Sequence, residues 1–379
     1  MSIPTSDSSL TNIISSEIKA SGPMTFARFM DLALYHPEHG YYSAPEPRIG
    51  REGDYYTSTD VHPMFGRLIA RQLEEMWNIL GRPAPFHIVE MGAGKGWLCS
   101  DTLEAARENS EFFNAITYVI CERSHAMRAR QAEITSRLAL PDGKIRWANI
   151  EELAGIEGCF LSNELVDALP VHRVVRRGDT LREVFVDLDS DGFIEREEAP
   201  SCAELADYFS FVGVELEDGQ QAEIRLAARD WLREVRRALR RGFVLTIDYG
   251  HDAEHLYAPR KFRGTLMCYH CHTANEEPLM RVGEQDMTAH VDFTALMKWG
   301  TTAGLDVTGF TNQAFFLLSL GLDEAMRLEA LTVMAPDAAL KQSMSLKRLI
   351  SPDGLGAFRV LIQHAGIEKP ALRGLTFLP

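Results

Sequence analysis

Apolar side chains along the chain follow two spacings, one typical of helices and the other typical of strands. Between Val61 and Leu80 they recur at helical intervals, which predicts a helix with one buried face. Short apolar runs then alternate with further helical patterns. The strands predicted from these runs cover residues 86–90, 116–121, 145–147, 159–162, 243–247, 305–308 and 357–363. This alternation predicts an α/β fold, with a parallel or mostly parallel sheet and helices on both faces.

Other segments interrupt the alternation and suggest how the chain is divided. The additional elements predicted are a helix over 25–35, a hairpin over 171–186, a long amphipathic helix over 221–241 and two helices within 313–349. We therefore predict four parts. They are an N-terminal helical and loop extension covering the active site (1–80), a cofactor-binding core (81–170), an inserted hairpin and helix (171–241), and the remainder of the core with an active-site loop and C-terminal helices (242–379).

Composition and charge narrow the class of protein. Of the 379 residues, 45% are hydrophobic and 25% are charged, as in ordinary soluble globular proteins. The net charge of −15 argues against a nucleic-acid partner, because contact with phosphates requires a basic face. It leaves a basic peptide or an arginine-bearing protein as a substrate class.

The cellular location was predicted from cysteines and from apolar segments. The six cysteines are scattered, without the spacing of a secreted disulfide framework. Residues 1–20 are rich in serine and threonine and contain one lysine, unlike a signal peptide or an arginine-rich transit peptide. No apolar stretch approaches the ~20 residues of a membrane helix, so no membrane insertion is expected. The predicted location is the cytoplasm.

Residues 86–96 combine an apolar run, an acid and three alternating glycines. They predict a buried strand, a tight loop and a helix N-terminus, which together bind nucleotides and nucleoside cofactors. Nucleoside triphosphates require Ser or Thr where Gly96 stands, and dinucleotides require a third glycine where Trp97 stands. S-adenosylmethionine (SAM) fits, with Glu90 facing its ammonium group. The loop residues assigned to it are Gly92, Ala93, Gly94 and Gly96. Read alone, the loop also suits an ordinary strand-to-helix turn.

The next strand ends supply further candidate cofactor contacts. Glu122 ends the second strand, where an acid accepts hydrogen bonds from ribose hydroxyls in this kind of fold. Asn149, after the third strand, is a candidate for the adenine amine, and Ile150 is a candidate for the adenine ring. A role for Asn149 in the turn itself is equally consistent. Asn163, at the end of the fourth strand, completes the predicted cofactor site.

Acidic side chains follow the fourth and fifth strands. Glu164 and Asp167 lie three residues apart, so a helical turn would bring both to one side. Asp248 ends the fifth strand, and ligands bind at the carboxyl ends of parallel strands. We predict these three carboxylates to be catalytic, and Asp54 and Tyr249 to bind substrate. The alternatives are helix capping for Glu164 and Asp167, and turn stabilisation for Asp54.

A Cys-Tyr-His-Cys-His run at residues 268–272 contains residue types that bind zinc. A structural zinc site needs a second ligand pair, and the other cysteines offer no Cys-x-x-Cys partner. No metal is therefore predicted.

Several short segments together resemble a known family. They are residues 22–26, 35–37, 40–42, 53–54, 65–66, 90–96, 163–170, 248–250, 264–269 and 286–293. In order and spacing they are similar to the MidA-like methyltransferases, which include the mitochondrial complex I assembly factor that methylates arginine. Lys95 stands where the family usually has arginine. The resemblance extends over about residues 21–362.

The resemblance implies a Rossmann-like methyltransferase domain, SAM as methyl donor and a protein substrate. In the mitochondrial relative the implied substrate is an arginine of a quinone-side complex I subunit. It also implies that carboxylates such as Glu164 hold the cationic guanidinium, a poor nucleophile, in bidentate geometry. Two other classes stay open: a non-catalytic complex I assembly or scaffold protein with the same fold, and a nicotinamide-dependent oxidoreductase, which the glycine spacing disfavours. The oligomeric state stays open, a dimer being one option.

Overall fold

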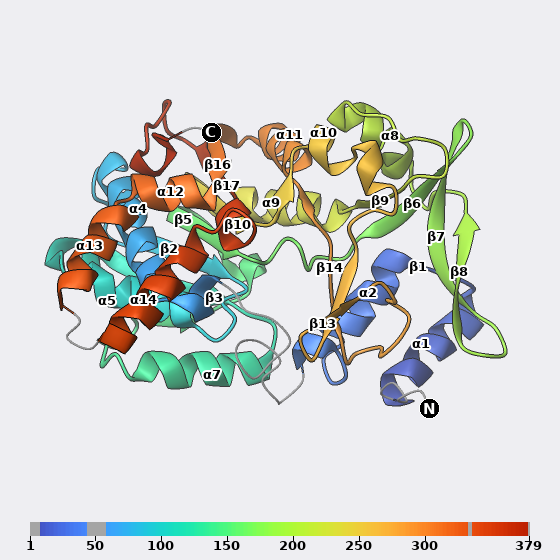
Figure 1. Cartoon of the computed structure of the whole chain (residues 1–379), viewed down its shortest axis with the longest axis horizontal. Helices are drawn as coiled ribbons and strands as arrows, with labels where there is room; N and C mark the ends of the chain where they lie inside the picture. The colour runs from blue at the N-terminus through green and yellow to red at the C-terminus, as the bar shows by residue number, and fades with distance from the viewer. Residues whose placement is uncertain (1–7, 44–57, 333–335, 378–379) are drawn as a thin grey trace. The chain divides into compact units, whose positions relative to one another are not determined.

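The computed structural model describes residues 8–43, 58–332 and 336–377 (Figure 1). The chain forms two compact units, each assembled from three segments. The seven-stranded unit comprises Tyr56–Leu165, Leu232–Tyr249 and Trp299–Pro379. The five-stranded unit comprises Met1–Tyr55, Val166–Trp231 and Gly250–Lys298. The predicted division of the chain into four parts stays a prediction.

A mostly parallel sheet forms the centre of the seven-stranded unit. Its strand order is β16-β17-β10-β5-β2-β3-β4. The five strands from β10 to β4 run parallel, and β17 pairs antiparallel with both β10 and β16. The strands are β2 (Phe86–Met91), β3 (Ile116–Cys121), β4 (Ile145–Trp147), β5 (Ile156–Asn163), β10 (Leu239–Asp248), β16 (Asp306–Asn312) and β17 (Arg359–Ala365). The predicted α/β fold with a mostly parallel sheet is confirmed.

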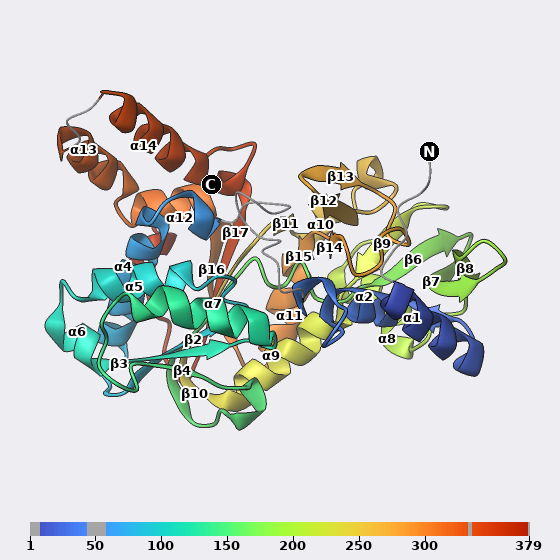
Figure 2. The same ribbon diagram turned by 90° about the horizontal axis from the view of Figure 1, so that it is seen from below.

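Helices bury one face of this sheet. The helices of the unit are α3 (Ser58–Val61), α4 (Met64–Ile79), α5 (Trp97–Ala106), α6 (Ser110–Ala115), α7 (His125–Ser136), α12 (Gln313–Ser319), α13 (Leu322–Thr332) and α14 (Pro336–Leu349). Figure 2 shows α4 and α5 next to each other over the sheet. Phe65 of α4 and Leu98 of α5 belong to one buried cluster with Ile88 of β2. Alternate strand residues face this cluster because the side-chain period of a strand is two.

The five-stranded unit contains a second, separate sheet. Figure 1 shows β6, β7 and β8 side by side, and β1 and β9 complete the sheet. Its strands are β1 (Met24–Thr25), β6 (His172–Arg177), β7 (Thr180–Leu188), β8 (Phe193–Glu198) and β9 (Gln221–Ile224). One strand pair follows, formed by β11 (Gly250–His251) and β15 (Val291–Asp292). A three-stranded sheet is formed by β12 (Met267–His270), β13 (Thr273–Asn275) and β14 (Asp286–Thr288). The helices are α1 (Ser8–Ser21), α2 (Phe26–Tyr35), α8 (Ala203–Val212) and α10 (Ala253–Leu256). Two of the boundaries between the units fall within helices, namely α9 (Leu226–Ala238) and α11 (Phe293–Ala303).

Two element predictions were wrong in their details. The long helix predicted over 221–241 is a strand, β9, then the helix α9, then the start of β10. Residues 221–224 become a strand because they pair antiparallel with β6, with His172 opposite Ile224. That partner lies about fifty residues earlier in the chain, so local spacing does not reveal it. Within the described part of residues 313–349 there are three helices, α12 to α14, instead of two.

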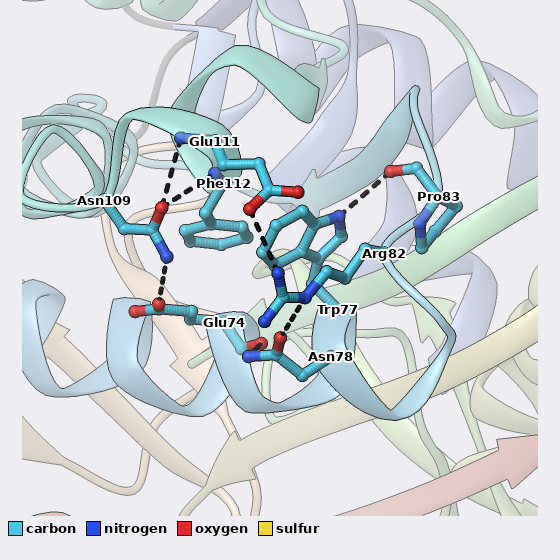
Figure 3. Close-up of polar contacts among 8 residues, drawn as sticks. All are labelled: Glu74, Trp77, Asn78, Arg82, Pro83, Asn109, Glu111 and Phe112. Carbon is cyan, nitrogen blue, oxygen red and sulfur yellow. Dashed lines mark hydrogen bonds and ion pairs between the residues drawn. The ribbon is translucent and has the colours of Figure 1, made fainter.

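A polar junction joins α4 to α6 in the seven-stranded unit (Figure 3). Asn109 caps α6, because its Oδ1 accepts hydrogen bonds from the backbone N–H groups of Glu111 (3.1 Å) and Phe112 (3.2 Å). Its Nδ2 donates to Glu74 Oε1 on α4 (2.6 Å). The rings of Phe112 and Trp77 pack together, with 5.4 Å between their centroids. Trp77 Nε1 donates a hydrogen bond to the Pro83 carbonyl (3.0 Å).

Asn109→Ala is expected to lower the free energy of unfolding by about 1 kcal/mol, since a helix cap and its anchor on α4 are lost together. Urea unfolding followed by tryptophan fluorescence measures the change. Glu111→Gln is the matched control. It weakens only an exposed ion pair with Arg82 (3.0 Å), and pairs of that kind contribute about 0–1 kcal/mol. Equal losses in the two variants would contradict the capping role.

Candidate active site

The glycine loop joins the carboxyl end of β2 to the N-terminus of α5. All three of its glycines have positive φ, namely 71° at Gly92, 49° at Gly94 and 88° at Gly96, where other residues are strained. The Gly96 N–H donates to the Ala93 carbonyl (2.8 Å), which closes the turn directly before α5. The Gly92 N–H donates to the Cys121 carbonyl at the end of β3 (3.2 Å). The first turn of α5 therefore directs its N–H groups toward the strand ends.

Glu90 lies at the end of β2, buried beside the glycine loop. Its side chain is 3% exposed, and its Oε2 accepts a hydrogen bond from the Tyr118 hydroxyl (2.8 Å). Burial raises the pKa of Glu90 to about 7; the Tyr118 hydrogen bond opposes the rise and the Glu122 charge adds to it. Among the described residues no lysine or arginine pairs with this carboxyl. An ammonium group would supply the missing positive charge, so the site fits the amino-acid end of SAM.

We expect the affinity for SAM to rise several-fold between pH 6 and 7.5. A bound ammonium favours ionised Glu90, so at a pH below its pKa of about 7 binding must first remove a proton. The α-amino group of the ligand itself stays mostly protonated over this range. Calorimetric titration with SAM at several pH values measures the effect.

Two variants test the source of this pH dependence. Glu90→Gln should make the affinity nearly independent of pH. Asp101→Asn is the control, because burial raises the pKa of Asp101 on α5 to about 7 as well. If the affinity still depended on pH in Glu90→Gln but not in Asp101→Asn, the titrating group would be Asp101, and the prediction for Glu90 would be contradicted.

Glu122 follows β3 and is held from two sides. Its Oε1 accepts from the Ser124 N–H (2.9 Å), and its Oε2 accepts from Gln131 Nε2 (3.0 Å). Burial raises its pKa, although these hydrogen bonds oppose the rise. Ser124 also caps α7, because its Oγ accepts a hydrogen bond from the Met127 N–H (3.3 Å). The carboxylate is thus fixed at the strand end, and its contact with ribose stays a prediction.

The residues predicted to contact adenine follow β4. Asn149 is exposed, and its side chain bonds to Arg128 (3.2 Å) and to Glu152 (3.0 Å). Ile150 is 7% exposed and begins a short 3₁₀ turn. These contacts suit a turn role for Asn149, so the adenine roles of both residues stay predictions.

Asn163 and Glu164 mark the end of β5. Asn163 Nδ2 and the backbone N–H of Ser58 on α3 both donate to Glu164 Oε1, at 3.0 and 2.9 Å. The Glu164 N–H donates to the Ile247 carbonyl of β10 (2.9 Å). Glu164 has φ of 52°, an unusual conformation for a residue other than glycine and one that recurs at functional sites.

Residues 164–167 do not form the helical turn that would have brought Glu164 and Asp167 to one side. No helix begins there, because Glu164 continues the pairing with β10 and then turns into the left-handed region. Asp167 belongs to the five-stranded unit, where it is 5% exposed. Its carbonyl accepts hydrogen bonds from Arg225 Nη2 (2.7 Å) and from the Ala289 N–H (3.1 Å).

Asp248 and Tyr249 follow β10, the neighbour of β5. Asn163 pairs with Ile247, so Glu164 and Asp248 follow adjacent strand ends. Asp248 is fully buried, and its Oδ1 accepts from the Tyr249 N–H (2.9 Å). Tyr249 packs its ring 5.5 Å from that of Phe358. The structure therefore brings together Glu164, Asp248 and Tyr249 in one unit, and Asp54 lies outside the described residues.

Two buried polar residues of these regions were missed in the sequence. Gln131 is fully buried on α7 and bonds to the glycine loop, Glu122 and Trp147. Gln131 lies four residues from both Met127 and Thr135, on the buried side of the helix. A polar residue at that spacing is the signal that could have identified it. Arg225, in the five-stranded unit, donates to the carbonyls of residues 167, 169, 289 and 290. Arg225 lay inside the helix predicted over 221–241, where a single arginine gives no such signal.

The Cys-Tyr-His-Cys-His run forms a tight hairpin between β12 and β13. Cys271 and His272 occupy its two central positions with φ of 49° and 59°, as a two-residue turn requires. Cys268 is buried in β12. Within residues 8–43, 58–332 and 336–377, no group of three or more His, Cys, Asp and Glu side chains is arranged to hold a metal ion. In the same residues, no helix is long and apolar enough to span a membrane.

Comparisons with known proteins identify the family of this chain. A family model described as "Putative S-adenosyl-L-methionine-dependent methyltransferase" matches residues 68–311. The chain is 30% identical to the mitochondrial protein arginine methyltransferase NDUFAF7 of Bos taurus, over 92% of this chain and 82% of that protein. It is 27% identical to the Homo sapiens protein of the same name, over 93% and 83%.

A solved structure of a similar protein indicates the cofactor. A protein from Burkholderia thailandensis, crystallised with S-adenosyl-homocysteine, matches with a TM-score of 0.87 and 30% identity over 98% of this chain and 97% of that one. S-adenosyl-homocysteine is what SAM becomes when it has given up its methyl group. SAM is thus the cofactor of this chain.

The comparisons also correct the predicted location. The relatives from Bos taurus and Homo sapiens are named as mitochondrial, so the cytoplasmic prediction is wrong. The structure records no disulfide among the six cysteines. The absence of disulfides does not distinguish one reducing compartment from another, which is why the prediction failed. With the matched family model, the relatives and the fold together, the chain belongs to the family of S-adenosyl-L-methionine-dependent methyltransferases.

Proposed function

We propose that this methyltransferase transfers the methyl group of SAM to an arginine side chain of a protein. The observation that carries the proposal is the Glu164 carboxylate, which follows β5 beside the end of β10. The similar proteins named as protein arginine methyltransferases support arginine as the acceptor. The acidic net charge of −15 also suits a basic protein substrate.

In the proposed cofactor site, the carboxyl ends of neighbouring strands surround SAM. Glu90 meets the ammonium group, the glycine loop lies against the amino acid and ribose, and Glu122 accepts from the ribose hydroxyls. The remaining proposed contacts are Ala93, Asn149, Ile150 and Asn163. This placement is supported by the burial of Glu90, which pairs with no lysine or arginine in the described part of the chain, and by the fixed orientation of Glu122.

SAM supplies a methyl group on a sulfonium, which is displaced in line by the attacking atom. The acceptor guanidinium nitrogen forms the new N–C bond while the S–C bond breaks, and the electron pair of that bond stays on the sulfur, which becomes a neutral thioether. The nitrogen gives up one proton to the solvent. Glu164 holds the guanidinium through charge-assisted hydrogen bonds and concentrates its positive charge away from the attacking nitrogen. Asp248 adds negative charge from the adjacent strand. Tyr249 is proposed to bind substrate. The roles of Asp54 and Asp167 stay predictions, because Asp54 lies outside the described residues and Asp167 belongs to the five-stranded unit.

The proposed acceptor protein is a subunit of respiratory complex I, on the quinone side. The choice of a complex I subunit as acceptor rests on the resemblance to the mitochondrial assembly factor. A scaffold protein that binds SAM and a complex I subunit without methyl transfer is the alternative function.

Two measurements test the proposal. Purified protein is incubated with SAM bearing an isotopically labelled methyl group and with the proteins of a strain that lacks this gene, and the products are analysed by mass spectrometry. Labelled methylarginine on a complex I subunit is the expected result. Label on lysine or on a small molecule would overturn arginine as acceptor. SAM binding without any labelled product would favour the scaffold protein.

A further inference from the structure

We propose that Gln131 is the positioning residue of the cofactor site, locking the glycine loop and Glu122 into one geometry. Its amide joins three elements of the seven-stranded unit. Nε2 donates to the Gly94 carbonyl (2.8 Å) and to Glu122 Oε2 (3.0 Å), while Oε1 accepts from Trp147 Nε1 (2.9 Å). Both amide hydrogens and the amide oxygen are therefore used in the protein.

The chemistry of the site selects glutamine. The two donor bonds run to acceptors, a carbonyl and a carboxylate, so a side chain with two hydrogens on one nitrogen satisfies both. The third bond needs an acceptor for the Trp147 indole, which donates only. Gln131 is fully buried, so breaking any of these bonds leaves a polar group without water.

Packing couples Gln131 to the loop as well. A Cβ added at Gly96 would lie 3.3 Å from Gln131 Cα, so α7 lies directly against the loop just before α5. Movement of Gln131 would shift both the Gly94 carbonyl and the backbone near Gly96. The same movement would release Oε2 of Glu122 from its side-chain partner, leaving the carboxylate held by the backbone N–H groups of Ser124 (2.9 Å) and Arg123.

The consequence for binding is preorganisation. Because Gln131 holds the loop and the acid before the ligand arrives, SAM does not have to order them on binding. The inference rests on the proposed placement of SAM between Glu90, the loop and Glu122. It assigns Gln131 no contact with the reacting atoms.

The experiment is calorimetric titration of three variants with SAM. Gln131→Met removes all three bonds at similar volume, and Gln131→Glu keeps the acceptor for Trp147 but removes the two donors. Both are expected to raise the Kd about tenfold or more, the loss typical of a hydrogen bond to a charged group. Thr135→Val is the matched control. Thr135 lies one turn further on the same buried face, and its hydroxyl bonds only to α7 carbonyls, so its Kd should stay within about twofold.

A double variant separates positioning from simple loss of structure. If Gln131 acts through Glu122, then Gln131→Met combined with Glu122→Gln should bind SAM more tightly than the product of the two single effects predicts. If the increase in Kd of the double variant equalled the product of the two single increases, the inference that Gln131 acts through Glu122 would be overturned. Thermal unfolding of each variant checks that the fold is kept.

The failure of this inference can be told apart from failure of the proposed cofactor site. Wild-type affinity in Gln131→Met and Gln131→Glu, with weakened binding in Glu90→Gln at pH 7.5, would overturn the role of Gln131 alone. Wild-type affinity in all three variants would place SAM elsewhere and overturn both.

Discussion

Glu164→Gln is expected to slow methyl transfer by on the order of 10²–10³-fold while leaving the affinity for SAM within about twofold. The substitution removes the negative charge that the proposed mechanism needs and little else. Glu164 Oε1 accepts from Ser58 and Asn163, and a glutamine carbonyl oxygen can accept the same two bonds. The local structure should therefore survive.

Glu157→Gln is the matched control for this prediction. Glu157 lies at the other end of the same strand, where its carboxylate pairs with Arg240 and with Arg241 (2.9 Å). Steady-state kinetics with the identified acceptor and calorimetry with SAM are run on both variants. Unchanged turnover in Glu164→Gln would remove this residue from the mechanism. An equal loss in Glu157→Gln would point to a general effect of β5 on the fold.

Gly158→Ala is expected to destabilise the protein by about 3–5 kcal/mol or to prevent folding. Gly158 lies in β5 between β2 and β10, with φ of 150°. A Cβ there would stand 2.0 Å from the His87 carbonyl oxygen, which belongs to the backbone of a central strand. Relief would require the strands to separate, and that would break hydrogen bonds in the middle of the sheet.

Gly155→Ala separates this clash from the cost of a positive φ. Gly155 precedes β5 by one residue and has φ of 66°, and an added Cβ there meets nothing within 4 Å. Gly155→Ala should lower the free energy of unfolding by only about 1–2 kcal/mol, the penalty of the left-handed conformation. Soluble yield and urea unfolding measure both variants. Similar stability of the two would show that the sheet accommodates the extra carbon.

The core elements could be predicted because their signals are local. β3 covers the predicted residues 116–121, and α5 begins at Trp97, directly after the glycines, as predicted. Buried parallel strands appear as continuous apolar runs, so their positions require no knowledge of their partners. Residues 221–224 had no such signal. They form a strand because β6 offers an open edge, and that edge exists only in the folded unit.

In the candidate site, too, some features could be predicted from local sequence and others could not. Glu90 and Glu122 could be predicted because each ends an apolar run, and the ends of parallel strands meet at one edge of a sheet. The raised pKa of Glu90 depends on burial and on Tyr118 of the next strand, which no local pattern reveals. Gln131 lay inside a helix with a weak apolar face, so nothing marked it as a partner of the loop.

By itself the sequence determined the chain order of the seven strands of the large sheet, the loop that suits SAM, and the acids that follow the strand ends. These depend on residues close together in the chain, where spacing and backbone preference act directly. Only the tertiary structure decided that Glu164 adopts a left-handed conformation instead of a helical turn, that β9 is a strand, and that Gln131 joins the loop to Glu122. Each of these depends on a hydrogen-bond partner distant in the chain, and the pairing exists only once the strands have been brought together.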